Sequence, residues 1–286
     1  MNYLTPVEIA ETCMTVGQKK ASLARHKILI LGVLAGAYIA FGANLATVVS
    51  SVWPPEWAGL GTLFYGLTFS LGLVLVVLAG AELFTGNNMF VMLSFLCKKV
   101  SFVGMWRNWL IVFAANFIGT LLLVLLLFFA NFHFNDPGLT AHGTKAVSIA
   151  INKLSLGWEQ AFFRAILCNW LVCLAIWLAF SAKDNISRIA GIMLPITAFV
   201  ACGFEHSVAN MFFIPMGLTV AGAVPPEVVA AIETVGLSVQ EVSQILNWKN
   251  FLVGNLLPVT LGNIVGGTIF VALFYWLAFL KKDKIR

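Results

Sequence analysis

Two short motifs place an acidic residue in the middle of long apolar stretches. Residues 80–87 read GAELFTGN and residues 203–210 read GFEHSVAN, so both follow the pattern G-x-E-x-x-x-x-N, 123 positions apart. An ionisable group at bilayer depth is costly, and such groups usually face a bundle interior or a water-filled pathway. The repeated motif therefore predicts a transporter or a channel with two related halves.

The composition of the chain is that of an integral membrane protein. Of its 286 residues, 60% are hydrophobic and 10% are charged, and the mean hydropathy is +0.94. Apolar runs of bilayer length predict transmembrane helices and an all-α fold. The candidate spans are 28–50, 58–80, 108–130, 158–180, 188–222 and 251–280. The last is longer than a bilayer requires and should be tilted or project beyond it.

The basic residues are distributed as the positive-inside rule requires for cytoplasmic termini. With both termini inside, 13 of the 17 Lys and Arg residues fall in cytoplasmic segments. The outer side then holds Lys145, Lys153, Arg164 and Lys249. The net charge of +5 thus follows membrane topology, and no nucleic-acid partner is expected. We expect a multi-pass protein of the inner (plasma) membrane with both termini cytoplasmic.

A second repeated pattern extends the relation between the halves. Residues 108–119 and 255–266 both carry N-x7-N-x2-G, in the third and the sixth span. Each half holds three spans, so the second half must be inserted upside down, which is a transporter architecture. We expect an N-terminal cytoplasmic amphipathic helix within 1–27, three-span repeats at 28–130 and 131–280, and a cytoplasmic tail at 281–286.

The second and fifth spans are expected to be broken near their middle. Gly80, Gly86, Asn87 and Asn88 form a weak helical stretch in the first half, and residues 202–203 precede a Glu-His pair in the second. Non-helical backbone at this depth is tolerated only where protein buries it or where it lines a cavity. The two breaks should therefore meet at a central pathway.

Four segments resemble the formate/nitrite transporter family. Residues 81–86, 168–177, 203–212 and 259–263 read AELFTG, CNWLVCLAIW, GFEHSVANMF and VTLGN. The resemblance covers almost the whole chain. It implies an aquaporin-like protomer of six transmembrane helices, assembled as a homopentamer with one pore in each protomer.

The resemblance also implies roles for single residues. Leu83-Phe84-Thr85 matches the loop that interrupts the second span and acts as a gate on the cytoplasmic side. His206 matches the single polar group between two apolar constrictions, and Lys153 matches the lysine of the outer vestibule. Glu205 and Asn169 match buried residues that hold this lysine or the loop. The residues expected at the constrictions are Phe69, Leu73, Leu83, Phe84 and Phe204.

The chemistry of His206 suits a pore as well as a structural role. A buried histidine can simply be satisfied by a neighbouring hydroxyl, but this one follows Glu205 at a predicted helix break. A neutral imidazole can donate a hydrogen bond to an anion, and its titration range suits it to lend a proton, although burial disfavours the imidazolium. Glu82 and Glu205 would repel an anion, so they are expected to hold the loops. Arg164 is expected to snorkel to the interface; lining the outer vestibule is the alternative.

We therefore expect a channel or transporter for small monovalent anions of weak acids, formate foremost, with proton-coupled passage if His206 lends a proton. Nitrite and hydrosulfide are the alternatives within the family. A neutral-solute channel of the aquaglyceroporin type is the alternative from another class, although the paired Asn-Pro-Ala loops of that class are absent. The sequence carries no nucleophile–base set, His-rich metal cluster or nucleotide-binding loop, so we expect neither an enzyme nor a bound cofactor.

Overall fold

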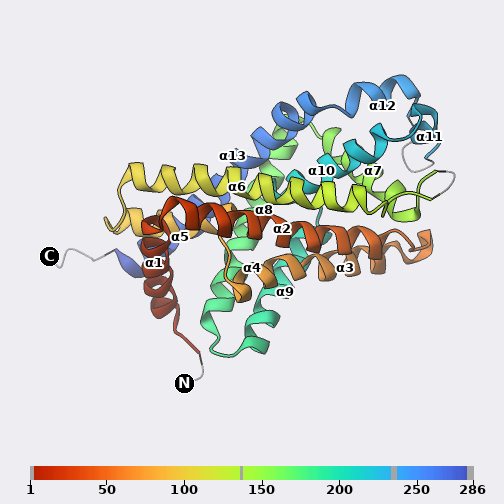
Figure 1. Cartoon of the computed structure of the whole chain (residues 1–286). Coiled ribbons are helices and arrows are strands. Elements are labelled where there is room, and N and C mark those ends of the chain that lie inside the picture. Colours follow the sequence, from red (N-terminus) through yellow and green to blue (C-terminus); the bar gives the residue numbers. More distant parts are fainter. Residues whose placement is uncertain (1–2, 136–137, 233–236, 282–286) are drawn as a thin grey trace.

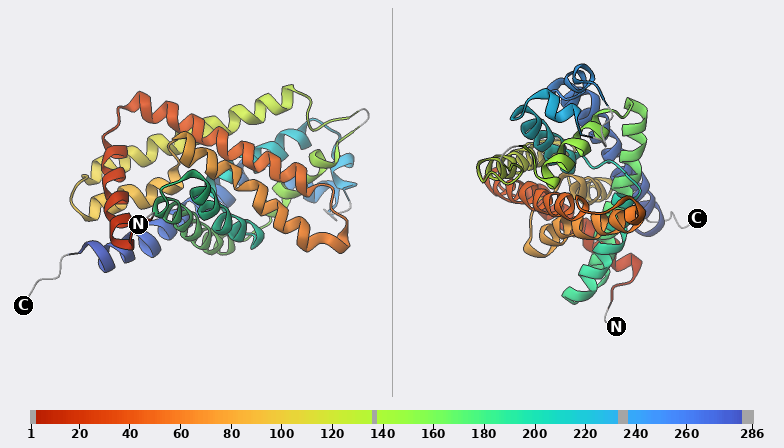
Figure 2. Two further views of the ribbon diagram at one scale, coloured as in Figure 1. Left: turned by 90° about the horizontal axis from the view of Figure 1, so that it is seen from below. Right: turned by 90° about the vertical axis from the view of Figure 1, so that its right-hand side faces the viewer.

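The protein is an elongated bundle of helices (Figures 1 and 2). The structure is a computed structural model and describes residues 3–135, 138–232 and 237–281. Within these ranges the only extended pairings are two isolated bridges. α2 and α6 lie side by side along the bundle, α1 lies across one end, and α11 and α12 lie at the opposite end (Figure 1).

The helices follow one another along the chain without a separate domain of another type. The first half contains α1 (Pro6–Ser22), α2 (Arg25–Ser50), the 3-10 turn η1 (Pro55–Trp57), α3 (Ala58–Phe69), α4 (Leu71–Ala79), α5 (Phe84–Leu96) and α6 (Phe102–Phe129). The second half contains α7 (Ala141–Leu154), α8 (Trp158–Ser181), α9 (Asn185–Ala201), α10 (Ser207–Gly222), α11 (Pro226–Ala230), α12 (Val239–Ile245), η2 (Asn250–Leu256), α13 (Leu257–Val265), η3 (Gly266–Leu273) and η4 (Trp276–Leu280). The last four form one long helix in which η2, η3 and η4 are π-helical.

Five helical stretches in the described part of the chain are long and apolar enough to cross a membrane. They are Arg25–Ser50, Ala58–Ala79, Phe102–Phe129, Trp158–Ser181 and Asn250–Leu280. Two shorter apolar helices, α9 and α10, follow each other within the fifth predicted span. The prediction of an all-helical membrane protein is therefore confirmed.

The helix break of the first half begins at Gly80, the first residue of the predicted weak stretch, but it is shorter than that stretch. α4 ends where Gly80 adopts φ +81°, and α5 begins at Phe84. Because glycine adopts this left-handed conformation without a steric penalty, it ends the helix at that point. Residues 86–88 lie inside α5, so the prediction of a break there is wrong. Thr85 also lies in the first turn of α5, and of the predicted loop only Leu83 belongs to the interruption.

The break of the second half lies where the sequence predicts it. α9 ends at Ala201, Gly203 adopts φ +66°, and α10 begins at Ser207. His206 is the N-cap residue of α10. Each break therefore ends in the first turn of a short helix, α5 in one half and α10 in the other.

Glycines allow the long helices to approach one another at backbone distance. A Cβ atom on Gly119 of α6 would overlap the carbonyl oxygen of Val33 in α2, and one on Gly266 would overlap that of Ile166 in α8. Small residues at such crossings permit close van der Waals packing, which drives helix association in membranes. Gly119 and Gly266 are the two glycines of the repeated N-x7-N-x2-G pattern.

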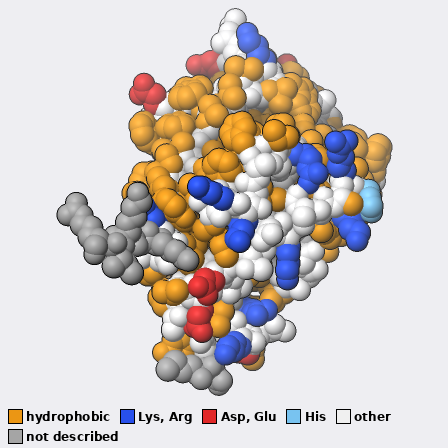
Figure 3. Space-filling model, turned by 90° about the vertical axis from the view of Figure 1, so that its left-hand side faces the viewer, with side chains coloured by type: hydrophobic (Ala, Val, Ile, Leu, Met, Phe, Trp, Pro, Cys, Tyr) orange, Lys and Arg blue, Asp and Glu red, His pale blue; other side chains and the backbone are white. Residues whose placement is uncertain are grey.

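α1 lies in the range where the sequence predicts a helix, and it packs against one end of the bundle. The Thr5 side chain accepts a hydrogen bond from the Glu8 N–H, and the Glu8 carboxylate accepts one from the Thr5 N–H, which is a capping box. The helix packs against α5, and it also contacts α8 and η4. Its buried residues are Ile9, Ala10, Cys13, Gly17 and Ala21. Figure 3 shows this end of the molecule, where many Lys and Arg side chains gather.

Replacing Gly119 by alanine should lower the free energy of unfolding by about 1–3 kcal/mol, because the added methyl group overpacks the contact with Val33. Gly59→Ala in α3 is the matched control, since a Cβ atom there would contact nothing within 4 Å and alanine favours a helix. Thermal unfolding of both variants in the same detergent measures the difference. Equal midpoints for the two variants would contradict close packing of α2 and α6.

Candidate functional site

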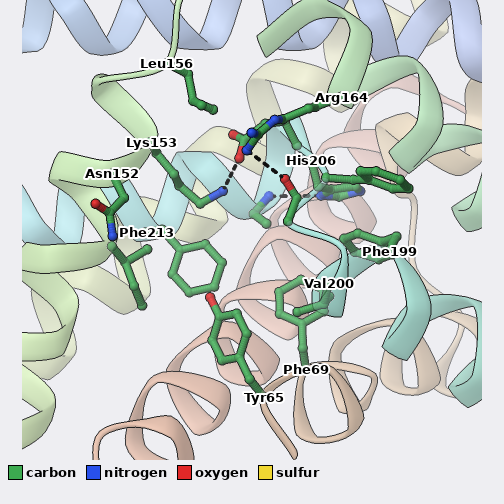
Figure 4. Close-up of a pocket in the computed structure, with 15 residues that line it drawn as sticks. Tyr65, Phe69, Asn152, Lys153, Leu156, Arg164, Phe199, Val200, His206 and Phe213 are labelled. Carbon is green, nitrogen blue, oxygen red and sulfur yellow. Dashed lines mark hydrogen bonds and ion pairs between the residues drawn. The ribbon is translucent and has the colours of Figure 1, made fainter. Parts of the chain in front are cut away.

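Two cavities approach the helix breaks from opposite sides. We call the first the α7 cavity; it has a volume of about 260 Å³ and lies among α3, α7, α8, α9 and α10 (Figure 4). We call the second the α1 cavity; it has a volume of about 250 Å³ and lies among α1, α4, α5 and α8. His206 lines the α7 cavity and Leu83 lines the α1 cavity. The corresponding residues of the two breaks thus face different cavities.

A row of apolar residues on one face of α3 and α4 separates the two cavities. Phe69 lines the α7 cavity and Val76 lines the α1 cavity, while Leu73 between them is 2% exposed. Residues three or four positions apart share a helix face, so these side chains form one continuous wall. Four of the five predicted constriction residues belong to this region: Phe69, Leu73, Leu83 and Phe204.

The fifth predicted constriction residue, Phe84, lies elsewhere. Its ring packs edge-to-face on Phe113 of α6, with ring centroids 5.0 Å apart, and it lines neither cavity. Leu83 and Phe84 are adjacent at the start of a helix, so their side chains point in different directions and only one can face the cavity. Phe84 therefore lines neither cavity here, and its part in a constriction stays a prediction.

Phe199 of α9 is a residue of this region that sequence reasoning missed. Its ring lies edge-to-face against Phe69, with centroids 5.7 Å apart, and stacks near His206 at 6.1 Å. The repeat could have pointed to Phe199, because the offset of 123 between the two motifs makes it the counterpart of Val76. Val76 lines the α1 cavity. Phe199 and Phe69 together narrow the α7 cavity beside the histidine.

The hydrogen bonds of His206 define which of its ring nitrogens carries a proton. The Ala209 N–H donates to Nδ1 at 3.0 Å, and Nε2 lies 2.9 Å from the Thr85 hydroxyl oxygen. A backbone amide can only donate, so Nδ1 must accept and the neutral ring carries its proton on Nε2. That proton is donated to Thr85, which keeps its own hydroxyl proton for another acceptor. His206 and Thr85 are both buried and join α10 to α5.

Lys153 is held in a closed network rather than exposed at the cavity mouth. Its ammonium forms an ion pair with Glu205 at 2.8 Å, and only 15% of its side chain is exposed. Asn210 donates to the Glu205 carboxylate at 2.6 Å and to Asn255 at 2.7 Å, and Asn255 donates to the Lys153 carbonyl oxygen at 3.0 Å. Lys153 thus lines the α7 cavity as one half of a neutral pair, not as a free cation.

The α1 cavity contains a matching network around a lysine that sequence reasoning missed. Lys20 of α1 forms an ion pair with Glu82 at 2.7 Å. Asn87 donates to Glu82 at 2.8 Å and to Asn108 at 2.9 Å, and Asn108 donates to the Lys20 carbonyl oxygen at 3.2 Å. Each member corresponds to one member of the Lys153 network. The two lysines lie 133 positions apart, which matches neither motif offset (123 or 147), so no sequence signal pointed to Lys20.

Two asparagines of the repeated N-x7-N-x2-G pattern hold the helix breaks. Asn116 and Asn263 each accept a hydrogen bond from a backbone N–H at the start of a short helix and donate two to backbone carbonyl oxygens. The partners of Asn116 are Phe84 N–H (2.9 Å), Gly32 O (2.8 Å) and Glu82 O (2.9 Å). The partners of Asn263 are Ser207 N–H (2.8 Å), Ala165 O (2.8 Å) and Glu205 O (2.9 Å).

Asn169 of α8 is a buried tether and lines neither cavity. Its side-chain amide donates to the carbonyl oxygens of Thr85 at 3.2 Å and Asn263 at 2.6 Å. It therefore holds the first turn of α5 against the last long helix. This placement fits the loop-holding role that the resemblance implied.

Arg164 lies on the wall of the α7 cavity (Figure 4). Its guanidinium donates to the Gly203 carbonyl oxygen at 3.4 Å, next to the second break. It therefore lines the cavity, as the alternative expects, while snorkelling to the membrane interface stays a prediction.

The sequence matches the model of one transport family along nearly its whole length. That family is described as formate/nitrite transporter, and the match covers residues 7–277. The chain belongs to the formate/nitrite transporter family. The predicted resemblance is thus confirmed, and the relatives below are transporters and channels, which supports a role other than catalysis.

Relatives of this transporter-family chain extend over its full length. A probable formate transporter of Methanothermobacter thermautotrophicus is 43% identical, over 98% of this chain and 99% of the relative. The formate channel FocA of Escherichia coli (strain K12) is 34% identical, over 99% of this chain and 96% of the relative. Among solved structures, a pentameric formate channel with formate bound is 38% identical with a TM-score of 0.77, covering 90% of this chain and 98% of that one.

In this member of the family, Lys153→Met should destabilise the protein by about 3–5 kcal/mol, because it leaves the Glu205 carboxylate buried without its cation. The double variant Lys153→Met/Glu205→Gln removes both charges and should recover much of the loss. Thermal unfolding of wild type, both single variants and the double variant measures the coupling as a double-mutant cycle. Additive effects would show that the pair does not stabilise the fold.

Proposed function

We propose that this protein is a membrane channel for small monovalent anions of weak acids, with formate as the foremost substrate. The relatives named formate transporter and formate channel support this substrate. The observation that carries the proposal is the buried pair of His206 and Thr85, which places hydrogen-bond donors between two cavities. The Thr85 hydroxyl can turn its proton toward an anion that enters from a cavity, and the anion can replace Thr85 as the acceptor of the His206 Nε2 proton.

The helix ends around this pair also favour an anion. Thr85 lies in the first turn of α5 and His206 caps α10, so the N-termini of both short helices converge here. A helix N-terminus carries a partial positive charge and unpaired N–H groups. Transporters use the N-termini of broken helices in this way to bind anionic groups near the middle of the membrane.

The apolar wall between the cavities is the main obstacle to an anion. The idealised cost of moving a small ion into a low-dielectric medium is on the order of 20 kcal/mol, and less in practice. A membrane potential that is negative inside opposes anion entry by about 2.3 kcal/mol per 100 mV. Hydrogen bonds donated by His206 and Thr85 offset part of this cost. The partial positive charge at the N-termini of α5 and α10 offsets a further part. Lys153 and Lys20 can each donate a hydrogen bond to an anion. Because each lysine is already paired with a glutamate, it does not bind the anion so tightly that passage stops.

The geometry favours hydrogen-bond donation by His206 over release of a proton from it. A neutral ring that gave up its Nε2 proton would become an imidazolate. An imidazolium could lend a proton, but its Nδ1 would then carry one and lose the hydrogen bond from the Ala209 N–H. Proton-coupled passage therefore requires the ring to break its contact with α10 in every cycle.

Other small solutes are second candidates. Nitrite and hydrosulfide are monovalent weak-acid anions that would meet the same donors, and the family description names nitrite. A neutral solute such as glycerol can accept hydrogen bonds there, but it carries no charge for the partial positive charge of the converging helix N-termini to stabilise. We therefore place it below the anions.

We further infer six spans arranged as two inverted repeats in an aquaporin-like protomer. The matched networks of Lys20 and Lys153 and of Asn116 and Asn263 support this arrangement. α1 corresponds to α7, so the first repeat runs from α1 to α6 and includes the helix that the sequence set apart within 1–27. The second repeat runs from α7 to η4. The pentameric formate channel among the structural relatives supports a homopentamer.

We also infer that the basic end shown in Figure 3 is cytoplasmic, in an inner (plasma) membrane. α1 and η4 both lie at this end, so both termini should be inside. A reporter enzyme fused after residue 286 should be active in the cytoplasm. Activity only outside the membrane would contradict the orientation.

The proposed function predicts formate flux in liposomes that depends on His206. Wild type should carry formate, nitrite and hydrosulfide faster than lactate, and lactate faster than glycerol. His206→Phe keeps an aromatic ring but removes the donor, so formate flux should fall about ten- to hundredfold, the value of a hydrogen bond to a charged group. His206→Asn keeps a donor that does not titrate and should retain part of the flux.

An internal pH dye separates the two modes of passage in the same liposomes. If formate crosses as a hydrogen-bonded anion, wild type and His206→Asn should acidify the interior only at the background rate of free formic acid. Faster acidification that is lost in His206→Asn would instead indicate a proton relay through the ring. Wild-type liposomes that carry glycerol but no anion would overturn the proposed function.

A further inference from the structure

The two cavities match in their ion-pair networks but differ at one charged position. The backbone carbonyl of Arg164 accepts a hydrogen bond from the Glu205 N–H at 3.4 Å, and the carbonyl of Leu31 accepts one from the Glu82 N–H at 3.2 Å. Arg164 and Leu31 are therefore equivalent positions in α8 and α2. A guanidinium stands in the second half where the first half has an aliphatic side chain.

This difference gives the two cavities different net charges. In the α7 cavity, Lys153 and Glu205 cancel and Arg164 remains, which leaves one net positive charge. In the α1 cavity, Lys20 and Glu82 cancel and no further charged side chain lines the wall. Within the described residues, no carboxylate lies within ion-pair distance of Arg164; both recorded ion pairs belong to the lysines.

The guanidinium of Arg164 is free to bind a ligand. Its residue is exposed, and its recorded side-chain hydrogen bond, to the Gly203 carbonyl oxygen, is long at 3.4 Å. Figure 4 shows the side chain directed into the α7 cavity toward Lys153. A guanidinium presents parallel N–H groups that match the two oxygens of a carboxylate. The arrangement therefore suits a small planar anion on its way to His206.

We propose that Arg164 is the docking residue for anions at the entrance of the α7 cavity and a determinant of anion selectivity. Its charge raises the local concentration of anions on this side only, so the channel takes up dilute substrate better through the α7 cavity than through the α1 cavity. The two parallel N–H groups of its guanidinium favour anions that carry two oxygens on one atom, such as formate and nitrite, over hydrosulfide. This inference rests on the proposed anion channel.

The test compares wild type with Arg164→Leu, which copies the residue found at position 31. Formate uptake is measured as a function of concentration in right-side-out and inside-out membrane vesicles. In one vesicle orientation, the half-saturating concentration should rise about fivefold, as expected for the loss of one solvent-exposed charge in contact with the anion. The maximal flux should stay unchanged, as should the whole curve in the other orientation. Size-exclusion chromatography in detergent checks that the assembly is intact.

Salt and a conservative variant separate attraction from recognition. Uptake of dilute formate by wild type should fall between ionic strengths of about 0.01 M and about 1 M, where the Debye length drops from about 30 Å to about 3 Å. Arg164→Leu should lose most of this dependence. Arg164→Lys should restore the salt dependence but not the full preference for formate over hydrosulfide. Lys249→Gln, which removes an exposed charge outside both cavities, is the control and should behave as wild type.

Three results would overturn the inference. The first is an Arg164→Leu curve that superimposes on wild type in both orientations while wild type carries formate. The second is a fall in maximal flux at unchanged half-saturation, which would assign Arg164 a structural role beside Gly203. The third is an equal loss in Lys249→Gln. Absence of anion flux in wild type would instead defeat the proposed function itself, so the two failures are distinguishable.

Discussion

A break in a membrane helix leaves backbone N–H and C=O groups that lipid cannot satisfy, and the protein must supply partners for them. Two equivalent asparagines, Asn116 and Asn263, meet this requirement, each binding one N–H and two carbonyl groups around a break. Gly119 and Gly266, three residues further along, let the same helices approach closely enough for these bonds to form. The repeated N-x7-N-x2-G pattern thus stabilises both helix breaks. The breaks in turn bring the starts of α5 and α10 together at the candidate site.

The second requirement is the burial of charge beside the breaks. Glu82 and Glu205 each sit near a break, and each is paired with a lysine from the short helix that closes its cavity, α1 or α7. An unpaired buried carboxylate would be strongly destabilising and would also repel an anion. Pairing removes both effects, and it ties α1 and α7 to the broken helices. The N-terminal helix α1 therefore belongs to the candidate site, because it supplies the lysine that pairs with Glu82.

Because the structural requirements are met twice in the same way, the residues that differ between the halves point to function. His206 corresponds to Leu83, and Arg164 corresponds to Leu31. Both changes replace an aliphatic side chain by a hydrogen-bond donor on the side of the α7 cavity. Together with Thr85, they arrange donors from the entrance of that cavity to the converging ends of α5 and α10. The α1 cavity keeps an apolar end at Leu83.

Local patterns in the sequence determined the all-helical membrane class and the presence of two helix breaks, because hydropathy, glycine and motif spacing act over a few residues. The same patterns extended the first break from Gly80 to residues 86–88, but these lie inside α5, where Asn87 donates to Glu82 and Asn108. Only the tertiary structure brought Lys20 to Glu82, 62 positions away, and Thr85 to His206, 121 positions away. It also turned Phe84 away from the cavities and Arg164 into one of them. Which side of a helix faces a cavity depends on the neighbouring helices that pack against it, and this is set by contacts between distant segments.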